Sequence, residues 1–306
     1  MHNKIVIIGC GNVGMSYAYA LLNQPTKVDE LVLIDIDKER IEGEVMDLNH
    51  SLVFAPKAID IKVGDYSDCR DATIVCICAG AKQAKNESRL DLLEKNKKIL
   101  KSIIDNVIQS SFDGIFLIAT NPVDIMTYLT YRYSYFEKGK VIGSGTSLDT
   151  VRLRYLIGKQ LNISPKNIHT YVIGEHGDSE FVPWSNAFVG SIKMEQLLNC
   201  ETLESLASEV KNAAYEIINK KGATYYAIGM VLVRITNAIL EDENTILTVS
   251  TYDENNNIYI GLPAIVNRHG VVGTIKIELT EEEREQYQCS VDVIKNEINK
   301  LISNKY

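Results

Sequence analysis

A glycine-rich loop close to the start of the chain constrains the fold more than any other feature. The loop Gly9-Cys10-Gly11-Asn12-Val13-Gly14 follows the apolar run at residues 5–8 and precedes a helical pattern that continues to Leu22. In this order, a strand, a GxGxxG loop and a helix bind a pyrophosphate, because small residues let backbone N–H groups and the helix N-terminus come close. The motif alone is weak evidence, so the neighbouring segments must decide whether it forms a nucleotide-binding site.

The next apolar run supports a dinucleotide site. Residues 31–34 form this run, which ends in Asp35, 21 residues beyond Gly14. A carboxylate at the end of the second strand accepts hydrogen bonds from the adenosine ribose hydroxyls and repels a 2'-phosphate. The sequence therefore predicts NAD, rather than NADP, as the cofactor; the alternative is that Asp35 is only a strand-end turn residue.

The first half of the chain alternates between apolar runs and helical patterns. Further extended segments are expected at residues 59–63, 73–78, 114–119 and 141–142, with helices at 37–54, 90–108 and from 123 onward. Strands that are apolar on both faces and separated by helices predict a parallel sheet covered on both sides, of the Rossmann α/β class. Ligands bind such sheets at the carboxyl ends of the strands.

Length and charge limit the possible classes of protein. With 306 residues, two packed domains are expected: a nucleotide-binding domain over 1–143 and a mixed α+β substrate-binding domain over 144–306. The net charge of -8 argues against nucleic acid and anionic membranes as partners. We find no signal peptide and no apolar run near the ~20 residues of a membrane span, so a cytoplasmic protein is expected. Cys76-x-Cys78 favours core packing over a metal site, and no metal is predicted.

The second half contains a candidate acid–base group. His176 lies in Gly174-Glu175-His176-Gly177-Asp178, directly after the apolar run at 171–173, so its imidazole is expected where a strand ends. Asp149 and Arg152 share one face of a helix predicted to run to Lys159. They could form a surface pair worth no more than ~0.5 kcal/mol. Alternatively, Asp149 orients His176 while Arg152 binds a substrate carboxylate.

The other segments complete the prediction. The small, polar loop at 79–89 is typical of a mobile lid, although it could be an ordinary exposed loop. Asn121-Pro122 fixes a turn that presents an amide to a ligand, or is plain turn chemistry. Helices are expected at 201–222, 225–240 and 281–303, and antiparallel strands at 245–252, 258–260 and 270–278.

Over essentially its whole length the chain resembles the L-lactate dehydrogenases of the lactate/malate dehydrogenase superfamily. The matching motifs are Gly9–Gly14, Asp35, Ala79-Gly80-Ala81 with Gln83 and Arg89, Asn121-Pro122-Val123-Asp124, Leu148-Asp149-Thr150-Val151-Arg152, Gly174–Asp178 and Lys221-Gly222-Ala223-Thr224. The resemblance implies reversible hydride transfer from NADH to pyruvate, giving L-lactate, with His176 as proton donor, Arg152 as carboxylate anchor and Arg89 polarising the carbonyl.

The resemblance also implies the binding residues. Those for substrate are Gln83, Arg89, Asn121, Asp124, Asp149, Arg152 and Thr224. Those for NAD are Gly9, Gly11, Val13, Gly14, Asp35, Arg40, Tyr66, Gly80, Ala81, Ser102, Ala119, Thr120, Asn121 and Ser144.

Gln83 separates the two enzymatic alternatives. Malate dehydrogenases resembling this pattern carry an arginine there for the second carboxylate of oxaloacetate, and a glutamine would leave that carboxylate unpaired at a cost of roughly a thousandfold in rate. A broader 2-keto acid specificity, as in hydroxyisocaproate dehydrogenases, stays open. A non-catalytic NAD sensor would have lost at least one of His176, Asp149, Arg152 and Arg89, and all four are present.

Two features concern regulation and the lid. Arg154 and His169 match positions that form a sugar-bisphosphate site between subunits in bacterial lactate dehydrogenases, which implies a homotetramer activated by fructose 1,6-bisphosphate. The alternative is a surface arginine and an unrelated strand histidine. The loop reads Ala84-Lys85-Asn86 where the family commonly has Lys-Pro-Gly, so a greater entropic cost of closure is expected.

Overall fold

The strands expected in the first half form a parallel sheet in this computed structural model. The structure describes residues 2–81 and 89–303, and the side chains of residues 2–81 and 91–301. The strands are β1 (Lys4–Ile8), β2 (Glu30–Ile34), β3 (Asp60–Val63), β4 (Ile74–Ile77), β5 (Ile115–Ile118) and β6 (Val141–Gly143). The helices between them are α1 (Asn12–Asn23), α2 (Lys38–Ser51), α3 (Arg89–Gln109) and α4 (Val123–Ser134), with short 3-10 turns η1 (Leu52–Phe54) and η2 (Tyr66–Cys69).

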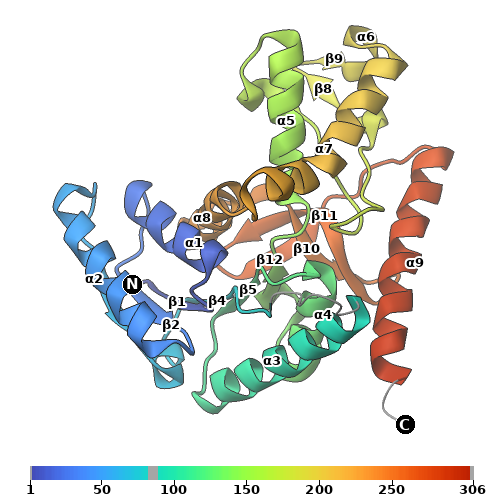
Figure 1. Cartoon of the computed structure of the whole chain (residues 1–306). Helices are drawn as coiled ribbons and strands as arrows, with labels where there is room; N and C mark the ends of the chain where they lie inside the picture. Colours follow the sequence, from blue (N-terminus) through green and yellow to red (C-terminus); the bar gives the residue numbers. More distant parts are fainter. Residues whose placement is uncertain (1, 82–88, 304–306) are drawn as a thin grey trace.

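Both faces of this sheet are covered. Its order is β6-β5-β4-β1-β2-β3. Within β1, Ile5 and Ile7 join one hydrophobic core while Val6 and Ile8 join another, because successive strand residues point to opposite faces. Figure 1 shows α1, α2 and α8 on one side of the sheet and α3 and α4 on the other. The predicted Rossmann class is confirmed.

The second half supplies the remaining elements. Its helices are α5 (Ser147–Leu161), α6 (Met194–Leu197), α7 (Cys200–Lys221), α8 (Tyr226–Leu240) and α9 (Glu281–Ser303). Its strands are β7 (Ile168–His169), β8 (Phe188–Val189), β9 (Ile192–Lys193), β10 (Thr245–Asp253), β11 (Ile258–Asn267) and β12 (Gly270–Thr274). None of the helices among the described residues is long and apolar enough to cross a membrane.

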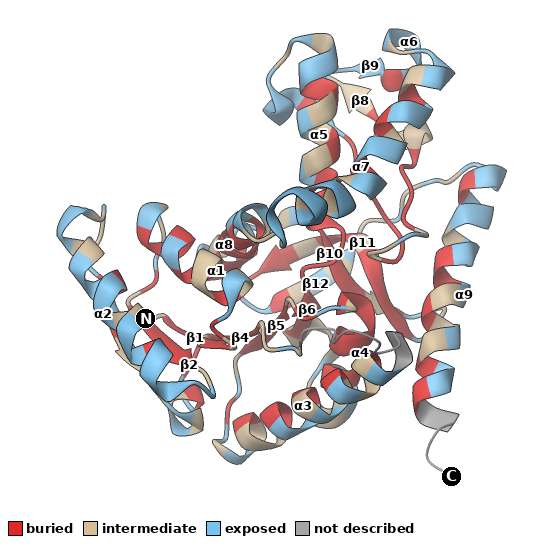
Figure 2. Cartoon of the chain, viewed as in Figure 1, coloured by how far each residue is buried: buried red, intermediate tan, exposed pale blue. Residues whose placement is uncertain are grey.

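The large sheet does not stop at residue 143. β10 pairs antiparallel with β6 through Ser250 and Gly143, and β11 and β12 follow, which gives nine strands in one sheet. In Figure 2 the red of buried residues continues from β6 into most of β10 and β11. The two halves therefore share cores, and the antiparallel strands extend the nucleotide-binding sheet.

A helix of the second half also packs on the nucleotide-binding helix. α8 lies against α1, and a Cβ at Gly229 would approach the backbone carbonyl of Ser16 to 2.9 Å. Glycine at this position lets the two helices come close. A third core, formed mainly by α5, α7 and the small sheet β7-β8-β9, fills the lobe at the top of Figure 1.

Three predicted segments differ from the structure, and one of them, the strand expected over 270–278, ends at Thr274. Residues 171–173 form no strand; Ile173 and Gly174 make isolated bridges to Phe181 and Gly261. The strand expected to end at residue 260 continues to Asn267, because its partners on both sides hold the backbone extended through residues that pattern rules read as breakers, Gly261 and Pro263.

Candidate active site

The glycine loop after β1 is tightly packed at two of its glycines and open at the third. Gly9 has a φ of +92°, and a Cβ there would overlap the backbone of Ala79, just after β4. A Cβ at Gly14 would overlap the carbonyl oxygen of Gly9. A Cβ at Gly11, in contrast, would meet nothing within 4 Å. Gly9 and Gly14 therefore seat the loop, and Gly11 leaves space where a pyrophosphate can approach the start of α1.

Asp35 stands at the end of β2 beside this loop. Its Oδ2 accepts a hydrogen bond from the backbone N–H of Cys10 at 2.7 Å and lies 3.3 Å from Nη2 of Arg40. Arg40 also donates to the carbonyl of Cys10 at 2.8 Å. The structure thus brings Asp35, Arg40 and the glycine loop together, and these contacts hold the carboxylate in place beside the loop.

The loops after β4 and β5 are joined by a residue that the sequence analysis missed. Asn96 of α3 is only 5% exposed. Its Oδ1 accepts a hydrogen bond from the N–H of Ala81 at 2.8 Å, and its Nδ2 donates to the carbonyl of Asn121 at 3.5 Å. Thr120 donates to the carbonyl of Ala79 at 2.8 Å. These bonds fix the predicted cofactor residues next to one another.

The remaining predicted cofactor residues are spread more widely. Ala119 follows β5, and the N–H of Ser144, which follows the neighbouring β6, donates to Ile118 at 2.8 Å. Val13 lies in the first turn of α1, and Gly80 is exposed between Ala79 and Ala81. Tyr66 is half-buried in η2, while Ser102 is exposed midway along α3.

His176 and Asp149 form a couple in which Asp149 is buried and His176 is partly buried. Nδ1 of His176 lies 2.7 Å from Oδ2 of Asp149, and the two side chains are 24% and 2% exposed. Nη1 of Arg152 donates to Oδ1 of the same carboxylate at 2.8 Å, with its side chain 12% exposed. Asp149 thus meets both partners, so the Asp149–Arg152 pair is not the surface pair considered from the sequence.

Asp124 holds the backbone of His176 in place. Its Oδ2 accepts from the N–H of His176 at 2.8 Å, and its Oδ1 accepts from the hydroxyl of Ser250 at 2.5 Å. Burial raises the pKa of Asp124 to about 6, although both hydrogen bonds act in the opposite direction. α4, β10 and the histidine loop therefore meet at this one carboxyl group, whose bonds fix the loop. Sequence reasoning gave Asp124 a contact with substrate and did not foresee Ser250.

The charges of His176, Asp149 and Arg152 set the pKa values of the first two side chains. Burial on its own would lower the pKa of His176, but the charge and hydrogen bond of Asp149 outweigh it and raise that pKa to about 9. Burial likewise opposes ionisation of Asp149, yet His176 and Arg152 bring its pKa below the ordinary value. At neutral pH the site therefore holds an imidazolium next to a carboxylate, which is the state that can give a proton.

Several predicted residues lie apart from the couple or outside the described part of the chain. Thr224 is half-buried in the link between α7 and α8. Arg154 donates to the carbonyl of Thr170 at 3.1 Å, next to the exposed His169. Gln83 and the substituted lid positions 84–86 lie outside the described residues, as does the side chain of Arg89, the first residue of α3.

Comparisons with known proteins agree over the whole length. Residues 3–143 match the family model of the lactate/malate dehydrogenase NAD binding domain, and residues 146–305 match that of its alpha/beta C-terminal domain. The L-lactate dehydrogenase of Geobacillus sp. strain WCH70 is 53% identical, with 99% of this chain and 98% of that protein aligned. That of Bacillus velezensis is 51% identical, with 96% of each chain aligned.

Solved structures give the same result. A lactate dehydrogenase from a Medee basin deep-sea metagenome superposes with a TM-score of 0.96 at 48% identity, covering 98% of this chain and 99% of that one. The minor L-lactate dehydrogenase of Enterococcus mundtii in its ligands-bound form gives 0.96 at 42% identity, covering 98% of each chain. With both family models matched in order, this chain belongs to the lactate/malate dehydrogenase family.

Proposed function

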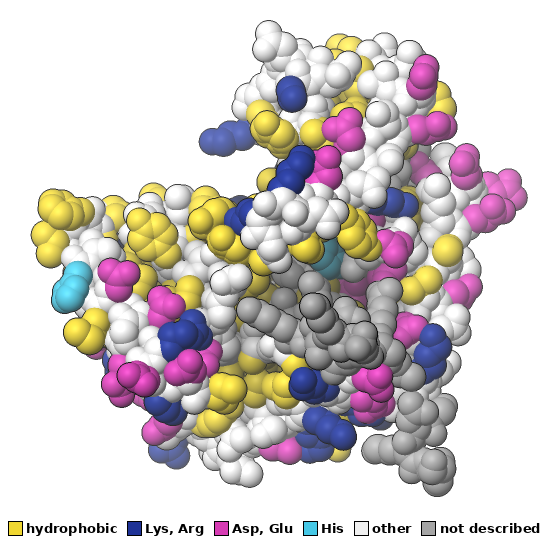
Figure 3. Space-filling model, in the orientation of Figure 1, with side chains coloured by type: hydrophobic (Ala, Val, Ile, Leu, Met, Phe, Trp, Pro, Cys, Tyr) yellow, Lys and Arg dark blue, Asp and Glu magenta, His cyan; other side chains and the backbone are white. Residues whose placement is uncertain are grey.

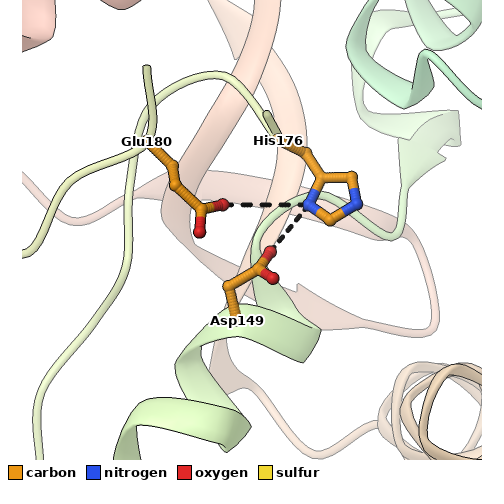
Figure 4. A group of neighbouring side chains, drawn as sticks. All are labelled: Asp149, His176 and Glu180. Atoms are coloured by element: carbon orange, nitrogen blue, oxygen red, sulfur yellow. Dashed lines mark hydrogen bonds and ion pairs between the residues drawn. The ribbon is translucent and has the colours of Figure 1, made fainter. Parts of the chain in front are cut away.

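We propose that the chain is an NAD-dependent L-lactate dehydrogenase that reduces pyruvate reversibly. The observation that carries this proposal is the partly buried imidazole of His176, held through Nδ1 by Asp149 with Arg152 on the other oxygen of the same carboxylate. Figure 4 shows Nε2 on the opposite side of the ring from the carboxyl groups, so it is the nitrogen left to meet a substrate. The open space over Gly11 fits the cofactor, which supplies the hydride.

The protonation state of His176 and Asp149 identifies the proton that is transferred. Imidazolium His176 gives its Nε2 proton to the developing alkoxide of pyruvate, and the carboxylate of Asp149 stabilises the charged imidazole until transfer. In lactate oxidation the neutral imidazole takes the proton back. Because His176 is a cation at neutral pH, pyruvate reduction is the direction for which the free site is already protonated.

Arg152 anchors the substrate carboxylate. One nitrogen of its guanidinium donates to Asp149, and the planar fork has further donors for a bidentate carboxylate. Asn121 positions the substrate carbonyl, Arg89 polarises it as charge develops, and Thr224 packs near the substrate. These three assignments rest on the family motifs.

Gln83 favours pyruvate over oxaloacetate in this proposal. A glutamine offers no cation to a second carboxylate, whereas the methyl group of pyruvate needs none. The test compares NADH oxidation by the whole protein with pyruvate, oxaloacetate and 2-ketoisocaproate. We expect kcat/KM for pyruvate to exceed that for oxaloacetate by roughly a thousandfold. Equal or greater activity with either competitor would make this a malate or a broader 2-hydroxyacid dehydrogenase.

The proposed assembly is a homotetramer activated by fructose 1,6-bisphosphate. Exposed apolar side chains support an interface. Figure 3 shows hydrophobic groups over α1, α2 and the adjoining turn η1, where Tyr19, Met46, Val53 and Phe54 are 57%, 61%, 77% and 94% exposed. Arg154 and His169 supply the basic groups for the effector. Arg154 donates to the carbonyl of Thr170, the residue that follows His169. Light scattering tests the assembly. Kinetics at subsaturating pyruvate, with and without the bisphosphate, test activation, and an unchanged KM removes that part of the proposal.

The proposed location is the cytoplasm. All six cysteines, each within the described residues, are free thiols, and Cys10, Cys69 and Cys76 are buried. Free thiols are usual where glutathione and thioredoxin keep them reduced. This observation supports a reducing compartment, and localisation of a tagged full-length chain tests it.

A further inference from the structure

A third carboxyl group, that of Glu180, lies against the His176–Asp149 couple. It stands next to Phe181, whose backbone N–H and C=O both pair with Ile173 at 3.0 Å. The side chain of Glu180 is 4% exposed. The bridge between Ile173 and Phe181, which closes the histidine loop, therefore fixes the position of Glu180, and its carboxyl group is almost wholly removed from solvent.

Glu180 approaches the same ring nitrogen as Asp149. Its Oε2 lies 3.9 Å from Nδ1 of His176, and this nitrogen and one carboxylate oxygen from each of Asp149 and Glu180 all lie within 4.8 Å of one another. Figure 4 shows both carboxyl groups on the Nδ1 side of the imidazole. Two buried carboxyl groups this close repel each other when both are charged, and a proton on one of them removes the repulsion and allows a hydrogen bond between them.

The surrounding charges decide which carboxyl group keeps the proton. Asp149 faces two cations, the imidazole of His176 and the guanidinium of Arg152, at 2.7 and 2.8 Å. Glu180 is farther from the imidazole. Burial raises the pKa of Glu180 to about 9, and the negative charge of Asp149 acts in the same direction. Glu180 is therefore the neutral partner at physiological pH.

The other charged groups near Glu180 come from every neighbouring element. Asp124 of α4 accepts a hydrogen bond from the backbone N–H of His176. The pocket behind Glu180 is lined by acidic groups of its own loop, by Lys211 of α7 and by Glu297 of α9. These groups set a background charge, whereas Asp149, His176 and Arg152 are the ones placed to act on Glu180 directly.

We propose that Glu180 is a positioning residue of the proton-transfer couple, which donates its carboxyl proton to Asp149 and, by ionising in alkali, extends the range over which His176 stays protonated. The first action holds the carboxylate of Asp149 against Nδ1 and Arg152. The second places a negative charge 3.9 Å from the imidazolium when hydroxide begins to remove its proton. This inference rests on the function proposed above.

Two substitutions separate these actions. Glu180→Gln keeps a donor of the same shape but cannot ionise, and Glu180→Leu removes both properties. For Glu180→Gln we expect kcat/KM for pyruvate at pH 6.5 to stay within about twofold, because the hydrogen bond to Asp149 is kept. Its alkaline midpoint should fall by roughly 0.5–1 pH unit. For Glu180→Leu, kcat/KM should fall about tenfold or more at every pH, because the Asp149 oxygen loses its donor.

Asp178→Asn is the matched control. It removes one acidic charge from the same loop, but Asp178 is exposed and accepts from the hydroxyl of Tyr215. We expect it to leave the alkaline midpoint unchanged. An equal shift in Asp178→Asn and Glu180→Gln, or no shift in Glu180→Gln, overturns the proposal, as does Glu180→Leu matching Glu180→Gln at neutral pH.

A second readout does not depend on catalysis. Imidazole NMR of the ligand-free protein should show His176 titrating at lower pH in Glu180→Gln than in wild type, and the carbon-13 carboxyl signal of Glu180 in wild type should titrate well above neutrality. If Glu180 of the wild-type protein titrates at or below neutral pH, that result alone overturns the inference. Absence of pyruvate reduction in wild type, with these titrations as expected, would instead reject the proposed function.

Discussion

The two ends of the proposed active site are formed by different kinds of chemical group. At the cofactor end, glycines and backbone N–H groups shape the surface, and Gly9 and Gly14 leave no room for a Cβ. At the acid–base end, Asp149, His176 and Glu180 are enclosed with their charges and protons. The cofactor end should therefore respond mainly to changes of volume, and the acid–base end to changes of charge. Charge and volume substitutions at each end test this comparison.

The largest effect is expected for Asp149→Asn. Loss of the carboxylate removes the interaction that opposes burial, so the pKa of His176 falls and the imidazole is neutral at pH 7. We expect kcat/KM for pyruvate to fall by about a thousandfold. Stopped-flow NADH binding should stay near the wild-type value. Loss of NADH binding together with activity would show that the two ends are not separate.

At the cofactor end, two glycines provide a matched pair. Gly14→Ala should lower the free energy of unfolding by about 2–3 kcal/mol, because its Cβ overlaps the carbonyl oxygen of Gly9. Gly11→Ala should unfold like wild type but bind NADH about tenfold more weakly, since its methyl group enters the open space. Denaturant melts and fluorescence titrations measure both. Equal stability of the two variants would contradict the packing argument.

The acid–base end should make stability depend on pH. The pKa of His176 is raised from 6.5 to about 9, so its stabilisation is complete below pH 6.5 and is lost as the pH rises through 9. Glu180 also keeps a proton in this window that the unfolded chain has released, so it adds to the loss. We expect the free energy of unfolding to fall by about 1.4 kcal/mol per pH unit for each proton. Denaturant melts from pH 6.5 to 9 should show a flatter slope in Asp149→Asn.

The smallest effect is expected for Asp35→Asn, a change of charge at the end where charge matters less. Its hydrogen bonds to Cys10 and a ribose survive in part, so NADH should bind about tenfold more weakly with kcat nearly unchanged. The variant should also discriminate less against NADPH. A fall in kcat as large as that of Asp149→Asn would break the proposed division of the site.

Sequence patterns predicted the cofactor end well because its determinants are local. The apolar runs, the glycine spacing and Asp35 lie within one βαβ unit, and the structure places them as expected. The acid–base end was predicted only in part. His176 and Asp149 meet as proposed, but Arg152 also contacts the carboxylate of Asp149. This contact was not predicted, because a spacing of three residues on a helix does not show which partners the two oxygens of a buried carboxylate will bind.

The missed residues share a physical cause. Asn96 sits in a charged helical pattern, and Glu180 follows Gly-Asp-Ser in what looks like a solvated loop. Ser250 is 126 residues from its partner Asp124. Each is buried by contacts with other segments of the folded chain, and the polarity of a residue alone gives no sign of such burial. The single shared sheet was missed for the same reason, since one pair of residues joins β6 to β10.

That junction has a consequence for how the chain is made. During synthesis β6 emerges roughly a hundred residues before the strand that pairs with its free side, so a nascent or truncated chain ending near residue 143 presents an uncovered edge. Such an edge invites pairing with other nascent chains. The ribosome-bound fragment is thus the form of this protein most exposed to aggregation, and the first in which a chaperone would be needed.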